Sequence, residues 1–400
     1  MELTLFNPTP CGFPKPRVPL LPDRAELLPL SKWCSESSPH STASHFRHFT
    51  RGRYALGEAY RLSGVDKDSA LLAPAYHCVT MLDPALTLGA DVQLYPLQPD
   101  LSPDLEKLDA LLATTKKPAK ALLATHFFGF AQDFTCLKQW CDQHDIVLIE
   151  DCSHVLFTEN FQAPGTGIFG KFVAASPYKF FACENGGLLH SSAEHLLDSI
   201  TTKSAGLMQE LRGIKHTIEK HRSTNALVSE ITRLDEQVQA LSTTPLITAD
   251  EQIVPYSHPS SMYSAAEAKT AALRSSRFIV RHASIKKNVA HRQNNYQRWA
   301  KETATLPNCR PLFPDLPTNG APYMFPLHID HPSPHFYWLK HLGVPVWRWD
   351  EMAISNCPVA QDYRLHLLHL PCHQSLSIDQ MDWMIAALQK TLRRSAQGTQ

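Results

Sequence analysis

The sequence predicts an α/β protein in which a large domain with a mainly parallel sheet is followed by a smaller C-terminal α/β domain. The chain has 400 residues, which suits two hydrophobic cores better than one. Apolar runs typical of buried strands alternate with helical segments along the first half, the order expected of a parallel sheet covered by helices. Several of these runs end in polar residues, at the edge of the sheet where ligands gather.

The first half supplies the elements of this sheet in order. Residues 1–48 read as an irregular, proline-rich arm, and a helix is expected to begin after Gly52 and to end at Gly64. Strand-like runs separated by loops and helical segments follow, with the sequences ALLAP, VQLYPL, ALLATHF and IVLIED. We therefore assign residues 49–250 to the large domain.

The second half predicts more helix than strand. Residues 191–245 form a polar helical stretch, which we interpret as an insertion in the large domain that faces solvent or a partner. A further helical run over residues 262–302 links to the small domain, which we place at residues 251–400. Two strand-like segments, YMFPLHI and VPVWRW, and a final amphipathic helix complete that domain.

The composition excludes several classes of partner. Lys plus Arg and Asp plus Glu both number 38, so we expect no nucleic-acid surface. No apolar run approaches the roughly 20 residues of a membrane helix, and the N-terminus lacks the pattern of a secretory signal. We expect a cytoplasmic protein without membrane contact.

The cysteines and histidines give no metal-binding pattern. Ten cysteines are scattered singly with no CxxC pair, which favours reduced thiols over a disulfide framework. The 21 histidines include no HExxH motif and no paired His/Cys spacing. We therefore expect no metal ion.

Two segments carry the chemistry. In VLIEDCSHVLF, Asp151 lies at the end of an apolar strand and His154 follows three residues later. Lys179 lies among aromatic residues and precedes a Gly-Gly pair. A fixed carboxylate opposite a pyridine nitrogen keeps that ring protonated, as pyridoxal phosphate requires. A lysine in apolar surroundings is a competent Schiff-base amine, because desolvation disfavours its ammonium form.

A third segment, TRGRYALGEAY, predicts a phosphate site. Gly52 opens the expected helix, whose free N–H groups and dipole would attract a phosphate. Each signal alone is common in proteins without this chemistry: a lysine before Gly-Gly is usually a surface residue, and an aspartate often ends a strand. Their order along the chain favours pyridoxal phosphate as the cofactor.

These motifs resemble the DegT/DnrJ/EryC1/StrS aminotransferases, which have the aspartate-aminotransferase fold (fold type I of pyridoxal-phosphate enzymes). GRYAL is similar to the family's phosphate-binding turn, and HFFGF is similar to its His-x-x-Gly strand end. IEDCSH is similar to the family's Glu-Asp signature, and SPYKFFACENGGLL is similar to the segment that contains its lysine. The resemblance is clear over residues 49–191 and fainter afterwards.

The resemblance assigns a role to each candidate residue. It implies that Lys179 holds the cofactor, that Asp151 pairs with the pyridine nitrogen and that His154 contacts the ring. The phosphate contacts would come from Gly52, Arg53, Tyr54 and Ser176. His126 falls at a strand end beside the cofactor, and Cys78 stands where many members place an aromatic residue over the ring, so that stacking would come from Tyr76 or His154 instead.

The function implied by the resemblance is transfer of an amino group from glutamate or glutamine to a keto-sugar. In this family the sugar is usually nucleotide-linked and belongs to surface-polysaccharide or secondary-metabolite synthesis, and a homodimer is expected. Trp347 and Trp349 could line a sugar pocket or belong to the core. Two alternatives stay open: dehydration or other carbanion chemistry, and a fold relative that only binds. A Rossmann-type dehydrogenase is disfavoured because no GxGxxG follows a strand.

Overall fold

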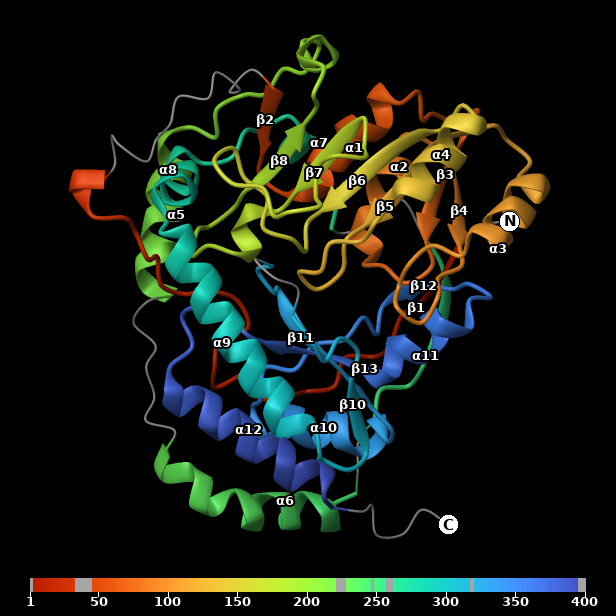
Figure 1. The fold of residues 1–400 in the computed structure, drawn as a ribbon. Helices are drawn as coiled ribbons and strands as arrows, with labels where there is room; N and C mark the ends of the chain where they lie inside the picture. Colours follow the sequence, from red (N-terminus) through yellow and green to blue (C-terminus); the bar gives the residue numbers. More distant parts are fainter. Residues whose placement is uncertain are drawn as a thin grey trace.

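The computed structural model describes most of the chain as two packed tiers (Figure 1). The described residues are 3–32, 45–220, 228–245, 248–256, 262–316 and 320–394. One tier contains a seven-stranded sheet, and the other contains a three-stranded sheet covered by the C-terminal helices. Whether the domain boundaries fall at residues 48 and 250 stays a prediction.

The seven-stranded sheet confirms the mainly parallel sheet that the sequence predicts. Of its seven strands, β8 alone runs against the others. In spatial order the strands are β2 (Phe46–Phe49), β8 (Gly187–His190), β7 (Phe172–Ala175), β6 (Val147–Cys152), β5 (Ala119–Thr125), β3 (Ala70–Pro74) and β4 (Asp91–Tyr95).

Both faces of this sheet are buried, which explains why its strands read as continuous apolar runs. Leu71 and Leu123 pack on one face with residues of α1, whereas Leu72 and Leu122 pack on the other face with residues of α3 and α4. The helices that follow the first strands are α1 (Gly52–Leu62), α2 (Asp83–Thr87), α3 (Leu105–Thr114) and α4 (Thr135–Gln143), with short 3-10 turns η3 (Val79–Met81) and η4 (Pro177–Lys179). Helix α1 begins and ends as expected, with Gly64 at φ 80° just beyond it.

The polar stretch after residue 191 contains the helices that the sequence predicts. Its elements are η5 (Glu194–Leu197), α5 (Leu207–Lys220), η6 (Val228–Arg233) and α6 (Leu234–Thr243), while residues 221–227 of the stretch lie outside the described part. Leu234 and Val238 of α6 are buried against the C-terminal helices rather than against the large sheet. The stretch therefore spans both tiers, with α5 beside one and α6 at the end of the other (Figure 1).

The expectation of a wholly irregular N-terminal arm is wrong at its start. Strand β1 (Thr4–Phe6) pairs with β9 (Ile253–Pro255) and with β12 (Met352–Ala353) in a small antiparallel sheet. Beyond it, a 3-10 turn η1 (Leu30–Lys32) is the last described element before β2. A three-residue strand whose partners lie some 250 and 350 residues away leaves no local pattern to recognise.

The C-terminal tier is built around an antiparallel sheet. Its strands, in spatial order, are β10 (Cys309–Pro311), β11 (Met324–Ile329) and β13 (Leu367–Pro371), and its helices are α10 (Pro332–Leu342), α11 (Pro358–His366) and α12 (Ile378–Leu392). Helices α7 (Ala265–Ala268), α8 (Arg274–His282) and α9 (Ile285–Thr303) lead into it. The expected strand VPVWRW is wrong, because only Trp347 forms an isolated bridge, to His369.

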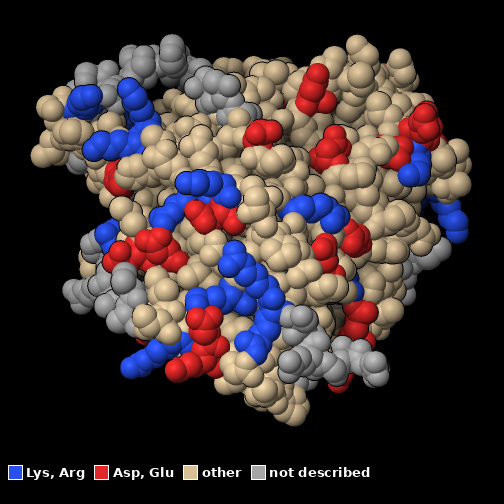
Figure 2. Space-filling view, turned by 60° about the horizontal axis from the view of Figure 1, so that its bottom comes forward, with Lys and Arg blue, Asp and Glu red and all other residues tan. Residues whose placement is uncertain are grey.

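The outer surface of the molecule mixes charges of both signs. Figure 2 shows Lys and Arg side chains interspersed with Asp and Glu side chains on the face that it presents. In the described part of the chain, no helix combines the length and apolar character needed to cross a bilayer.

Candidate functional site

A cavity of about 310 Å³ lies where the carboxyl ends of the parallel strands meet the C-terminal tier. The segments that follow β3, β6 and β7 supply one wall, and residues around β11 and β13 supply the other. Its lining is Leu20, Leu21, Arg51, Gly52, Arg53, Cys78, Thr80, Met81, His154, Ser176, Tyr178, Lys179, Met262, Tyr323, Met324, Trp347, Trp349 and His369. Six of the nine predicted site residues are in this lining, and Asp151, Tyr54 and His126 are not.

Lys179 reaches the cavity from the 3-10 turn η4 that follows β7. Pro177 fixes the first turn of this segment, and the Lys179 amide donates to the Ser176 carbonyl over 3.0 Å. The Lys179 Nζ lies 5.4 Å from the centroid of the Tyr323 ring. The lysine is therefore held at the boundary between the two tiers, with its amine against an aromatic face.

Asp151 lies in the layer of side chains behind the cavity wall, with 1% of its surface exposed. Its carboxylate accepts from the Ser153 amide over 2.8 Å and lies 3.3 Å from His77 Nε2. Burial alone would raise the pKa of Asp151, but hydrogen bonds from His77 and Ser153 and the charge of Lys179 outweigh it and lower the pKa. Asp151 is thus a fixed, ionised carboxylate within the electrostatic reach of Lys179.

His154 forms part of the aromatic wall. Its ring stacks on Tyr323 with centroids 4.6 Å apart, and its Nδ1 is buried without a hydrogen-bond partner among the described residues. Burial, together with the charges of Lys179 and His77, lowers the pKa of His154 well below its usual range. The ring is therefore neutral, and His154 contributes to the cavity wall as an uncharged aromatic ring.

The amino end of α1 forms a small polar cradle. A Cβ added at Gly52 would lie 2.2 Å from the Ser176 Oγ, so that only glycine permits this approach. The Ser176 hydroxyl donates to the Ser153 hydroxyl over 3.0 Å. Two hydroxyls therefore stand beside the helix amides at an end of α1 that attracts anions.

The side chains of two residues in the predicted phosphate turn are already hydrogen-bonded to partners within the chain. The Tyr54 hydroxyl donates to Glu267 Oε2 over 3.1 Å, and its amide donates to the Arg51 carbonyl, so Tyr54 is occupied outside the cavity. The Arg53 guanidinium donates to the Met262 carbonyl. Met262 lines the cavity together with Arg53, so the Arg53 side chain stays beside the cavity, whereas the Tyr54 hydroxyl is bound to Glu267 outside its lining.

His126 is placed away from the cavity. Its Nε2 lies 2.8 Å from Glu150 Oε1, and its Nδ1 accepts from the Gln132 amide over 2.9 Å. Glu150 precedes Asp151 in β6, and successive residues of a strand point to opposite faces. His126 therefore belongs to the buried polar network on the opposite face of the sheet.

The C-terminal tier contributes residues that the sequence did not single out. Tyr323 and His369 line the cavity together with Trp349, and the Tyr76 hydroxyl is hydrogen-bonded to His369 Nε2 over 3.0 Å. Trp347 and Trp349 line the cavity, as one of their two interpretations proposed. Tyr76 is fully buried behind this wall, so His154 rather than Tyr76 is available for stacking.

These features fit pyridoxal phosphate. Lys179, His154 and the cradle of Gly52 and Ser176 line one cavity. The buried carboxylate of Asp151 is close enough to Lys179 for the lysine charge to lower its pKa. Cys78 also lines the cavity, with its Sγ 3.1 Å from Thr80 Oγ1. The cradle would hold a phosphate, and the aromatic wall would cover a flat ring.

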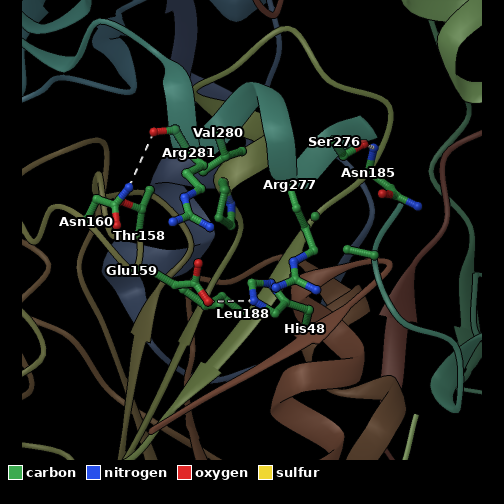
Figure 3. Close-up of a pocket in the computed structure, with 14 residues that line it drawn as sticks. His48, Thr158, Glu159, Asn160, Asn185, Leu188, Ser276, Arg277, Val280 and Arg281 are labelled. Carbon is green, nitrogen blue, oxygen red and sulfur yellow. Dashed lines mark hydrogen bonds and ion pairs between the residues drawn. The ribbon is translucent and has the colours of Figure 1, made fainter. Parts of the chain in front are cut away.

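A second, narrower cavity of about 30 Å³ lies behind the Gly186-Gly187 pair (Figure 3). His48 Nε2 and Glu159 Oε1 are 2.8 Å apart there, and the side chains of Arg277 and Arg281 point toward this pair from α8. These charges lower the pKa of Glu159 although burial opposes it. The His48–Glu159 ion pair belongs to its wall, and the cavity shares none of the residues predicted to bind the cofactor.

Comparison with known proteins confirms the resemblance. The model of the DegT/DnrJ/EryC1/StrS aminotransferase family matches residues 39–389. GDP-perosamine synthase of Vibrio cholerae is 24% identical over 53% of this chain, and L-glutamine:2-deoxy-scyllo-inosose aminotransferase of Streptomyces kanamyceticus is 28% identical over 40%. The chain spans 59% and 40% of the lengths of these two relatives.

Solved structures confirm the fold. The aminotransferase TlmJ from Streptoalloteichus hindustanus superposes with a TM-score of 0.60 at 15% identity, covering 92% of each chain. NtdA from Bacillus subtilis, solved with bound cofactor PMP, gives 0.59 at 14% identity and covers 92% of this chain and 79% of its own. The predicted fold of pyridoxal-phosphate aminotransferases is therefore the fold of this protein.

Proposed function

The chain belongs to the DegT/DnrJ/EryC1/StrS aminotransferase family, a family of pyridoxal-phosphate-dependent enzymes, and from this premise we propose that it transfers an amino group with Lys179 as the catalytic residue. The observation that carries the proposal is the meeting of Lys179, Ser176 and Gly52 in one cavity, with the ionised Asp151 within the electrostatic reach of Lys179. Three distant segments of the sequence supply the contacts that this cofactor needs.

Pyridoxal phosphate, when bound, supplies an electron-withdrawing ring next to the carbon that exchanges its amino group. Asp151 holds a proton at the ring nitrogen, because its carboxylate is kept ionised by Ser153 and His77. The amides at the start of α1 and the Ser176 hydroxyl anchor the phosphate. Lys179 first holds the cofactor and then moves a proton at the reacting carbon.

The second wall of the cavity excludes water and selects the acceptor. Tyr323, Trp347 and Trp349 cover the space in front of Lys179 with aromatic surface. The half-exposed Trp347 lies at the mouth, where a sugar ring can stack on it. We propose a keto-sugar as acceptor, nucleotide-linked in its usual form, and glutamate or glutamine as donor. The names of two relatives, GDP-perosamine synthase and L-glutamine:2-deoxy-scyllo-inosose aminotransferase, support a nucleotide-linked acceptor and an amino-acid donor.

Absorption spectra of the protein with pyridoxal phosphate test the proposal. We expect a band at about 410–430 nm that Lys179→Ala abolishes and that bleaches when the wild-type protein meets glutamate or glutamine. Lys171→Ala, which changes an exposed lysine eight residues earlier, is the matched control and keeps the band. A wild-type protein without the band at saturating cofactor would overturn the enzyme assignment, and a band that no amino donor bleaches would favour other carbanion chemistry.

We also propose a homodimer, and helix α5 supports it. Leu207, Leu211, Ile214 and Ile218 recur at spacings of four, three and four residues and form one exposed apolar stripe. The nine cysteines in the described part of the chain form no disulfide with one another, which supports a reducing cytoplasmic location.

Light scattering tests the dimer. Replacement of Ile214 and Ile218 by glutamate places two charges on the stripe, so we expect the mass to fall from two copies to one. Glutamates at the exposed polar positions Gln209 and Lys215 of the same helix are the control and leave the mass unchanged. A wild-type protein that is monomeric at micromolar concentration would contradict the proposal.

A further inference from the structure

A cluster of two histidines and one aspartate lies in the C-terminal tier, apart from the residues that line the cavity. His328 lies near the end of β11, and Asp362 and His366 lie one turn apart on α11. His328 Nε2 is 2.9 Å from Asp362 Oδ2, and His366 Nε2 is 4.0 Å from Asp362 Oδ1. One nitrogen or oxygen of each residue lies within 4.8 Å of the other two, so a single ion could contact all three.

The ring of His366 is oriented as a metal ligand. Its Nδ1 is 2.8 Å from the Ile329 carbonyl, which can only accept, so Nδ1 carries the hydrogen. In the neutral ring, Nε2 therefore carries the lone pair and faces Asp362. A histidine that ligates a metal usually donates its other N–H to a backbone carbonyl or carboxylate in this way.

The ring of His328 has one nitrogen without a hydrogen-bond partner in the described part of the chain, and a cation bound at the other nitrogen would account for it. Its side chain is 6% exposed, and its Nδ1 has no hydrogen-bond partner among the described residues. The carboxylate Oδ1 of Asp330 lies 4.0 Å from this Nδ1. When a cation takes the lone pair of Nε2, the ring hydrogen moves to Nδ1 and faces Asp330. Both histidines then have an acceptor behind them.

The charges and the access also suit a cation. Asp362 and Asp330 face the cluster with two negative charges, and Arg310, 3.6 Å from Asp330, offsets part of them. The Asp362 and His366 side chains are 42% and 29% exposed, which leaves a path from solvent.

We propose that His328, Asp362 and His366 bind a divalent cation with a preference for imidazole ligands, such as Zn²⁺, with water completing its coordination. Two imidazoles and one carboxylate are a donor set that zinc accepts with an open position. The ion joins α11 to β11. Strand β13 follows α11 directly and carries His369 to the cavity, so the ion stabilises the wall of the site without touching its chemistry.

The other buried group of comparable composition does not have these properties. His126, Glu150 and Cys152 also lie within reach of one another. Both oxygens of Glu150 already accept hydrogen bonds from backbone amides, and burial chiefly raises the pKa of the Cys152 thiol far above its usual range. Its donors are therefore satisfied within the chain.

Calorimetric titration with ZnCl₂ tests the proposal on the full chain, freed of its affinity tag and dialysed against a chelator. We expect one saturable zinc site that MgCl₂ does not fill, and binding at least tenfold weaker in His366→Gln and in Asp362→Asn. Both substituted side chains are partly exposed, so the variants keep the fold even if His328→Gln does not. The matched control is His144→Gln, which changes an exposed histidine 3.7 Å from a single carboxylate, that of Asp109.

Thermal unfolding gives the second readout. Zinc should raise the melting temperature of the wild-type protein and of His144→Gln, and should raise it less in His366→Gln and Asp362→Asn, because an ion bound only to the folded state stabilises it. Equal zinc affinity in the wild type and both cluster variants would overturn the proposal, as would a wild type that binds zinc no better than magnesium.

Discussion

Two neighbouring carboxylates on strand β6 differ in what surrounds them. Glu150 and Asp151 are both buried, and each lies beside a histidine on its own face of the sheet. Glu150 accepts from the amides of Gly167, Phe169 and Gly170 in addition to its histidine. Asp151 accepts from one amide, that of Ser153.

The difference separates a structural carboxylate from a functional one. The Glu150 oxygens are saturated and fully enclosed, so they hold the loop between β6 and β7 in place and have no capacity for a ligand. Asp151 keeps capacity for another donor and lies behind the cavity that contains Lys179. Both carboxylates are buried and lie beside a histidine. They differ in how many of their oxygen lone pairs are still able to accept a hydrogen bond, and this number distinguishes the functional carboxylate from the structural one.

The largest expected effect tests the structural half of this comparison. In Glu150→Gln, the new amide NH₂ group faces backbone N–H groups, and two donors cannot hydrogen-bond to each other. The buried groups that were paired with the Glu150 charge lose their partner, so the free energy of unfolding should fall by about 3–5 kcal/mol. Urea unfolding of the apoprotein measures it. Glu106→Gln, on the exposed first turn of α3, is the control and should change it by only a few tenths of a kcal/mol. A fall of the same small size in both variants would show that the Glu150 network is dispensable.

The next effect tests the functional half. Asp151→Asn keeps the shape of the side chain and removes the charge, so the rate at which glutamate or glutamine bleaches the bound cofactor should fall on the order of 10²–10³-fold. The free energy of unfolding should fall less than in Glu150→Gln, because fewer donors, the Ser153 amide and His77, are left with a weaker acceptor. Stopped-flow absorption measures the rate. If this variant unfolds as readily as Glu150→Gln while its rate is unchanged, the roles of the two carboxylates are reversed.

The sequence could predict the sheet and the central residues of the site because their signals are local. Asp151 ends an apolar run, and Lys179 precedes a Gly-Gly pair in an aromatic segment. The same reasoning placed His126 beside the cofactor, because a strand end shows that a residue lies at the correct edge but not on which face. The periodicity of a strand that is buried on both faces cannot supply that information.

The site residues of the C-terminal tier could not be predicted from the sequence for a different reason. Tyr323 and His369 come to the cavity through pairing of β11 with β13, and His328 meets Asp362 across 34 residues of sequence. His77 stands next to Cys78 and pairs with Asp151 74 residues away. No spacing rule connects such positions. The absence of a metal-binding motif in the sequence therefore gave no information about a cluster of ligands that only the fold brings together.

The last prediction extends the comparison to a buried histidine without a carboxylate. Burial and then the charge of Lys179 lower the pKa of His369 to about 3. The unfolded chain takes up a proton at this residue near pH 6.5, and the folded chain cannot do so until about pH 3, so the free energy of unfolding falls as the pH drops below 6.5. The expected contribution of His369 is about 2 kcal/mol between pH 7 and pH 5.

Replacement by glutamine removes this titration and keeps a hydrogen-bonding group for the Tyr76 hydroxyl. Urea unfolding of the apoprotein at pH 7 and pH 5 should therefore show a loss of stability about 2 kcal/mol smaller in His369→Gln than in the wild type, whereas His144→Gln should follow the wild type. An equal loss in all three proteins would mean that the folded state admits a proton at His369. The cavity wall opposite Lys179 would then carry a positive charge at pH 5. The carboxylate of Asp151 would be the one group that stabilises the charged form of Lys179 against this repulsion.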